Sequence, residues 1–177
     1  DVVDGGTSFI GNLLLNDGGD GISLREALVA SGNSAGADEV RVSRTGTIQL
    51  TGGEISLREN VRVIGPGSAQ LTLDRAGGGR AFVVSGGEVE VTGFTLANGS
   101  ADTGGAIVVT GGATLTVRSS LLTHNTARGA GSHGGAIHVV GATLNLIDSE
   151  ISDNSAIPSG SGGVGGGLSV VSGSTVN

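Results

Sequence analysis

The segment that decides the fold is Gly104-Gly-Ala-Ile-Val-Val109, because it returns as Gly134-Gly-Ala-Ile-His-Val139 and again as Gly165-Gly-Gly-Leu-Ser-Val170. The three copies begin 30 and 31 residues apart. Each is followed by a Gly-containing turn and a second short run: Thr114-Leu-Thr-Val117, Thr143-Leu-Asn-Leu146 and Thr175-Val176. The first two copies also share a third run, Leu122–Ala127 and Ile151–Ala156. This spacing indicates an internal repeat of about thirty residues.

Each run within the repeat is short and alternates apolar with polar side chains. Ile107 and Val109 are separated by one residue, as are Leu115 and Val117. This spacing is typical of a strand and not of a helix. A run of three or four residues becomes stable only when the same run of the next copy pairs beside it, at ~4.8 Å. The pattern therefore predicts an all-β fold, a three-faced parallel β-solenoid in which each repeat forms one coil.

The alignment of the repeats also predicts which side chains stack inside the solenoid. Five inward rows are expected: Phe82–Ile107–Ile137–Leu168, Val84–Val109–Val139–Val170, Val89–Leu115–Leu144, Val91–Val117–Leu146 and Leu96–Leu122–Ile151. Asn125 and Asn154 align at a turn, so we expect their amides to form a ladder that also binds turn backbone. A tight turn beside them is expected to hold Ala101, Ala127 and Ala156.

The N-terminal segment carries helix signals in place of strand signals. Ser23 is a suitable N-cap, and Glu26, three residues later, completes a capping box. Gly32 is expected to end this short amphipathic helix in a left-handed conformation. We therefore predict two parts, a cap over residues 1–37 that covers the end of the solenoid, and coils over residues 38–177. The last repeat stops at its second run, so we expect the natural chain to continue.

Composition excludes several classes of protein and partner. The 177 residues carry a formal net charge of −7, with 9 basic residues, all Arg, against 16 acidic ones. An acidic chain without a basic cluster is not expected to bind nucleic acid, and no apolar run is long enough to insert into a membrane. There is no Cys, Trp, Tyr or Met, and Phe occurs three times. An interior of Val, Ile, Leu and Ala suits a thin, repetitive core.

Two parts of the sequence resemble known families. Asp20-Gly-Ile-Ser-Leu-Arg-Glu-Ala-Leu28 resembles the signature of the CSLREA domain of bacterial surface proteins, with Ile22 in place of the family's Cys. Val63-Ile-Gly-Pro-Gly67 is similar to that family's early coils. The Gly-Gly-Ala-Ile units are similar to the repeats of chlamydial polymorphic outer-membrane proteins. The resemblance implies a right-handed parallel β-helix on an exported, often adhesin-like protein, and it implies no activity.

Some parallel β-helix proteins are polysaccharide lyases or hydrolases, so the acidic residues of the chain could form an active site. Such enzymes pair carboxylates, or place Ca²⁺ ligands beside an Arg base. The best cluster contains five residues: Asp148, Glu150, Asp153, His124 and Arg118. We interpret these as turn and outer-face residues. Ser132-His-Gly134 is similar to the Gly-His-Gly motif of polygalacturonases, but that family's paired Asp motifs and its Arg-x-Lys motif are missing.

Other candidate ligand sites match their patterns poorly. The turn Asn16–Gly21 does not match an EF-hand loop, because a loop that begins at Asn16 has no oxygen ligand at positions 3 and 12. Whether the turn binds calcium in another way is left open by the sequence. His138 aligns with Val108 and Ser169 and is expected to face solvent. The outward rows mix Glu, Thr and Asn, which argues against ice binding. Phe82 and Phe94 fall on inward positions, which removes them as sugar-stacking platforms.

The sequence thus predicts a non-catalytic structural or adhesin-like module of a secreted or cell-surface bacterial protein. No residue is assigned a catalytic, cofactor-binding or metal-binding role. Expected partners are the rest of a longer chain and a host or matrix surface, contacted through the turn loops Asp102-Thr103, Arg128–His133 and Ile157–Val164. Two alternatives remain: a fragment of a polysaccharide lyase or glycoside hydrolase, and a self-assembling surface-layer or filament component.

Overall fold

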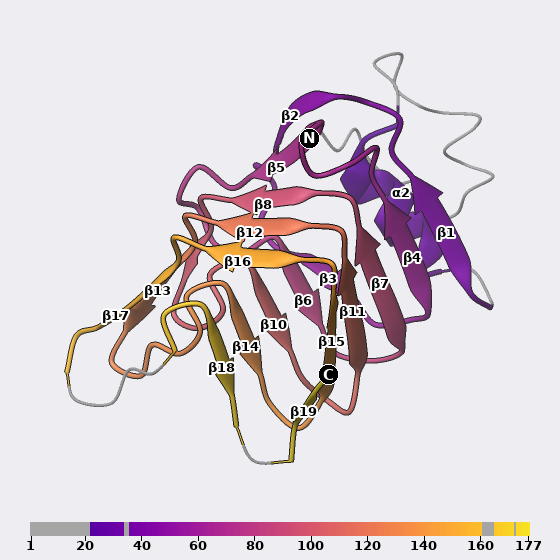
Figure 1. Ribbon diagram of the computed structural model, residues 1–177. Helices are drawn as coiled ribbons and strands as arrows, with labels where there is room; N and C mark the ends of the chain where they lie inside the picture. Colours follow the sequence, from indigo (N-terminus) through magenta and orange to yellow (C-terminus); the bar gives the residue numbers. More distant parts are fainter. Residues whose placement is uncertain (1–21, 34–35, 161–164, 172) are drawn as a thin grey trace.

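The chain forms a parallel β-solenoid with one short helix near its N-terminal end (Figure 1). The computed structural model describes residues 22–33, 36–160, 165–171 and 173–177. The elements are α2 (Leu24–Ser31), β1 (Asp38–Arg41), β2 (Gly46–Gln49), β3 (Ile55–Leu57), β4 (Val61–Ile64), β5 (Leu71–Asp74), β6 (Phe82–Val84), β7 (Glu88–Thr92), β8 (Thr95–Ala97), β9 (Ser100–Ala101), β10 (Ile107–Val109), β11 (Thr114–Arg118), β12 (Leu121–Thr123), β13 (Thr126–Gly129), β14 (Ile137–Val139), β15 (Thr143–Ile147), β16 (Glu150–Ser152), β17 (Ser155–Pro158), β18 (Leu168–Val170) and β19 (Thr175–Val176).

The strands build four parallel sheets, which we name A to D. Sheet A has the order β1-β4-β7-β11-β15-β19, sheet B β16-β12-β8-β5-β2, sheet C β18-β14-β10-β6-β3, and sheet D β17-β13-β9. Each coil contributes one strand to each of sheets A, B and C before the chain moves to the next coil. Figure 1 shows the coils stacked in chain order, from indigo beside α2 to yellow at β19. About five turns are formed in this way.

The strand register confirms the alignment of the predicted inward rows, but Val170, in the last coil, is 42% exposed. Ile107 pairs with Phe82 on one side and Ile137 on the other, and Ile137 pairs with Leu168. The other rows follow the same alignment. Phe82, Ile107 and Ile137 have no exposed surface. The apolar contacts therefore run along the solenoid axis as one continuous core, which the upstream pairs between Val40 and Leu73 extend.

A fourth short sheet lies beside the three predicted ones. The alanines assigned to a tight turn lie in sheet D, where Ala127 pairs with Ala101 and Ala156. The paired glycines explain how the chain turns so sharply before sheet C. Gly134 has φ +60, and a Cβ on Gly135 would overlap the Gly166 carbonyl oxygen and lie 2.5 Å from the Ser155 nitrogen. Only glycine lets these backbones approach each other.

The helix has the predicted N-terminus and a different C-terminus. The Ser23 side chain accepts from the Glu26 amide, and the Glu26 carboxylate accepts from the Ser23 amide, so the capping box is confirmed. Gly32, however, has φ −65 and is right-handed, because its amide continues the helical bonding to the Leu28 and Ala30 carbonyls. Leu24 and Leu28 join the core beside the edge strands β1 and β3. Residues 1–21 of the predicted cap lie outside the described residues.

Candidate functional surfaces

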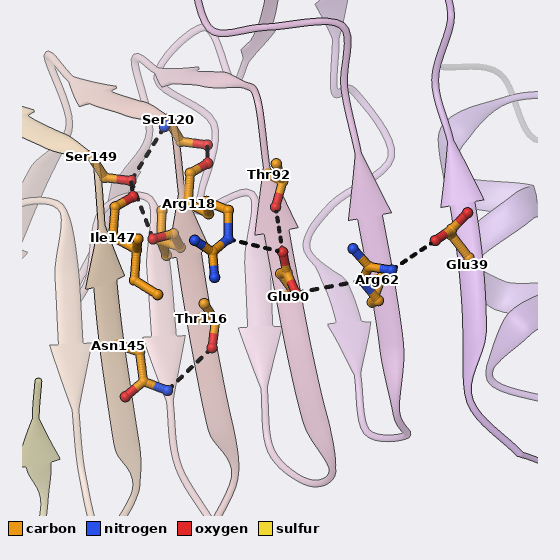
Figure 2. Close-up of polar contacts among 11 residues, drawn as sticks. Glu39, Arg62, Glu90, Thr92, Thr116, Arg118, Ser120, Asn145, Ile147 and Ser149 are labelled. Atoms are coloured by element: carbon orange, nitrogen blue, oxygen red, sulfur yellow. Dashed lines mark hydrogen bonds and ion pairs between the residues drawn. The ribbon is translucent and has the colours of Figure 1, made fainter.

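The outer face of sheet A carries a row of alternating charges that we call the charged ladder (Figure 2). Strand register places Glu39, Arg62 and Glu90 side by side, and Arg118 reaches Glu90 from the next coil. The ion-pair distances are 3.0 Å for Arg62–Glu39, 3.4 Å for Arg62–Glu90 and 3.4 Å for Arg118–Glu90. Arg41 adds a contact of 2.6 Å to Glu39. The charged ladder therefore links four successive coils from β1 to β11.

Glu90 is the centre of the charged ladder. Partial burial alone would raise the pKa of its carboxyl group, but the Thr92 hydroxyl and the guanidinium groups of Arg62 and Arg118 together hold that pKa below its ordinary value. Thr92 donates to Glu90 over 2.9 Å. Toward the C-terminal coils the same row becomes uncharged. There the Asn145 amide donates to the Thr116 hydroxyl and the Asn177 amide donates to Asn145, at 3.2 and 2.8 Å.

The predicted amide ladder of Asn125 and Asn154 is confirmed. The Asn125 amide donates to Asn154 Oδ1 over 3.0 Å and to the Leu96 and Thr123 carbonyls. Its own Oδ1 accepts from the Gly99 amide one coil earlier, at 2.9 Å. Because Asn125 is 1% exposed, these bonds replace water for three backbone groups that would otherwise be buried without partners.

A second corner is joined through serine hydroxyls. Ser120 Oγ accepts from the Phe94 amide, and Ser149 Oγ accepts from the Ser120 amide, each over 3.2 Å. An open groove of about 550 Å³ lies over this corner. Its lining residues are Ser68, Ser119, Ser120, Leu121, Leu146, Asp148, Ser149 and Glu150. The groove thus combines hydroxyls, two carboxylates and a small apolar floor.

The proposed acidic cluster is spread over two corners. Asp148 and Asp153 lie at opposite ends of β16, and both have left-handed backbones, with φ 49 and 55. His124 aligns with Asp153 and also has φ 55. Asp, Asn and His are the side chains that tolerate this conformation best, which gives their presence a backbone reason. Arg118 is bound to Glu90 in the charged ladder. Asp148 and Glu150 both line the groove.

The prediction that His138 faces solvent is wrong. His138 does align with Val108 and Ser169 on the outer side of sheet C, but it is only 7% exposed. Burial lowers the pKa of His138, and the charge effects of His133 and Arg80 lower it further. A hydrogen bond with the Ser169 backbone acts in the opposite direction and is outweighed. The His133 ring stacks on His138 with centroids 5.3 Å apart. The aligned Val108 and Ser169 are 7% and 5% exposed, so this position on sheet C is buried in each of the three coils and not by the histidine stack alone.

Two of the three segments expected to contact partners begin inside sheet D, because Arg128 lies in β13 and Ile157 in β17. Asp102, Arg128 and Ile157 are exposed, whereas Ser132 has no exposed surface. Residues 161–164 of the last loop lie outside the described residues, and so does the candidate calcium turn Asn16–Gly21. Among the described residues no three His, Asp or Glu side chains form a group that could hold a metal ion. The described part of the chain also contains no helix with the length and apolar character needed to cross a lipid bilayer.

Fold and surfaces together define a parallel β-solenoid whose coils are linked by apolar, amide, hydroxyl and charged contacts along the axis. No protein-family model matches the chain, and neither a curated protein nor a solved structure matches it. The resemblance to CSLREA domains therefore rests on the helix motif and early coils alone.

Two features were missed by the sequence reasoning. The charged ladder could have been predicted from the sequence. Pairing Val61 with Val89 in neighbouring strands places Arg62 beside Glu90. The stacking of His133 on His138 depends on how a loop folds back over sheet C, and the period of the repeat carries no signal for that.

Proposed function

We propose that the chain is a non-catalytic structural module, adhesin-like in role, of a secreted or cell-surface bacterial protein. The observation that carries this proposal is that adjacent coils are linked along the axis on several faces at once. The core rows, the amide ladder, the serine corner and the charged ladder each connect one coil to the next. Such a rod resists bending and leaves few backbone segments open to a protease.

Recognition is assigned to the loops that follow sheet D. They lengthen toward the C-terminal coils, and they project from a position where insertions leave the strand register of Ala101, Ala127 and Ala156 unchanged. The partners we propose are a host, neighbouring-cell or matrix surface and the remainder of a longer chain. The extracellular location and the right-handed coil are proposed on the CSLREA resemblance.

A binding experiment tests this function. Immobilised matrix proteins and cell-surface glycans are probed with the chain and with a variant in which Arg128, an exposed residue of β13 at the start of the predicted contact segment, is changed to Ser. The proposal predicts saturable binding that the loop variant weakens and that Arg44→Ser, at an exposed residue between β1 and β2, does not. Binding that neither substitution alters, or that both alter equally, contradicts recognition through the loops.

A second candidate is a polysaccharide lyase or hydrolase, which the groove beside Asp148 and Glu150 favours. Incubation with acidic and neutral polysaccharides, with and without Ca²⁺, tests it. New reducing ends or unsaturated products that disappear in Glu150→Gln would replace the structural proposal with this one. The third candidate, self-assembly, predicts a mass by light scattering that grows with concentration.

A further inference from the structure

The segment before β14 folds back onto the outer face of sheet C. Gly134 has φ +60 and lies so close to β14 that a Cβ there would overlap the Ile137 carbonyl oxygen and come within 3.1 Å of the His138 nitrogen. This brings His133 over His138, with ring planes 17° apart. In strand register His138 is flanked by Val108 of β10 and Ser169 of β18, neither of which is charged.

The stacked rings are poorly supplied with hydrogen-bond partners. Nδ1 of His133, Nδ1 of His138 and the hydroxyl of Ser132 are each buried and unbonded among the described residues. A neutral imidazole tolerates this better than an imidazolium, which has two N–H groups to satisfy. Burial of the charged form without partners is costly.

The charges that act on His138 are also unfavourable to a proton. His133 contributes from the loop and Arg80 from the segment before β6. Glu54, the carboxylate near Arg80, is bound to the Arg80 guanidinium at 3.1 Å. A proton on His138 is therefore opposed both by His133 and by the Arg80 guanidinium.

We propose that the His133–His138 stack is an acid-sensitive latch, which holds residues 130–133 against sheet C while His138 is neutral and releases them when His138 is protonated. The opened segment binds protons at the ordinary histidine value, near 6.5, whereas the closed latch resists them. The closed state is thus fully stable above that value and loses stability as the pH falls below it. The latch operates whether or not the loops bind a partner.

The repeats supply a matched substitution for each of the three histidines. The preceding coil has Val108 where His138 stands and Thr103 beside His133, and Asn98 aligns with His124. The variants are therefore His138→Val, His133→Thr and, as a control away from the latch, His124→Asn. Each places in one coil a residue that the neighbouring coil already accommodates.

Histidine ring signals followed by NMR across pH 4.5–8 measure the latch directly. We expect the titration midpoint of His138 to lie below 6.5 and to rise in His133→Thr. Hydrogen exchange of residues 130–139, corrected for intrinsic rates, is expected to accelerate on acidification by about tenfold for each pH unit below the onset of protonation. His138→Val removes that acceleration, and His124→Asn keeps it. If one variant fails to fold, the other carries the test.

Two results would overturn the latch. One is a His138 midpoint that does not move when His133 is replaced. The other is an acid-induced acceleration of exchange that persists in His138→Val or disappears in His124→Asn.

Discussion

Replacing Asn125 by Ala is the most demanding single test of the contacts between coils. The substitution removes the acceptor of the Gly99 amide and the donors to the Leu96 and Thr123 carbonyls, at a side chain that is 1% exposed. A buried backbone group that loses its partner costs about 1–3 kcal/mol, and neighbouring losses are only partly additive. We therefore expect the free energy of unfolding to fall by about 3–5 kcal/mol.

Urea unfolding followed by far-UV circular dichroism measures this loss, since the chain has neither Trp nor Tyr for fluorescence. Asn145→Ala is the matched control. The Asn145 side chain makes two hydrogen bonds on the outer face of sheet A, to Thr116 and Asn177, and neither partner is a buried backbone group, so its loss is expected to cost at most about 1 kcal/mol. Equal losses for the two variants, or a loss below about 1 kcal/mol for Asn125→Ala, would refute the view that the amide ladder holds the coils together.

Three further outcomes are expected. Gly135→Ala should lower the free energy of unfolding in urea by at least about 3 kcal/mol, because the added Cβ overlaps the backbone of the next coil. The control Gly112→Ala has φ +74 but open space around the added Cβ, so it should cost about 1–2 kcal/mol. Equal costs for the two variants would contradict the close approach at Gly135. The pKa of Glu90 is lowered in the folded chain, so the stability contributed by its carboxylate is present above the unfolded value near 4.5 and is lost as the pH falls. Between pH 5 and 3, Glu90→Gln should therefore lose less stability than wild type, by under about 1 kcal/mol. Identical pH profiles of stability would show that the Glu90 carboxylate does not stabilise the charged ladder. Asn98-Gly99 should resist deamidation in the folded chain, because the attacking Gly99 nitrogen is hydrogen-bonded at 2.9 Å, and mass spectrometry should show loss of the amide only after unfolding.

Most of the architecture could be predicted from the sequence because the apolar residues recur with two periods. A period of two residues indicates strands, and a period of about thirty residues indicates stacked coils. The alignment of Ile107 with Ile137 also predicts the register of the later strands of sheets A, B and C. The capping box was predictable for a similar reason, since it depends on Ser23 and Glu26 three residues apart. Both features arise from local spacing.

What escaped prediction depends on contacts between segments that the repeat does not align. The strands of sheet D lie close to the Gly-Gly turns, since a Cβ on Gly135 would come within 2.5 Å of the Ser155 nitrogen. This closeness is a property of the backbones and not of the side-chain pattern. The position of His138 is buried in the neighbouring coils as well, at Val108 and Ser169, and the stacking of His133 on it depends on a loop that lengthens in that coil. Gly32 stays right-handed because its amide finds helical acceptors.

The distance between Thr47 and Glu150 tests the stacked coils most directly. Both are exposed outward positions of sheet B, and strand register connects them through Thr72, Thr95 and Leu121, a separation of four inter-strand steps. Because the chain has no native Cys, nitroxide labels on Thr47→Cys/Glu150→Cys report this one distance by double electron–electron resonance. A single narrow distribution near ~19 Å is predicted from four spacings of ~4.8 Å. A broad distribution, or one centred well beyond ~30 Å as expected when more than a hundred residues are not folded back on one another, would contradict the coaxial solenoid.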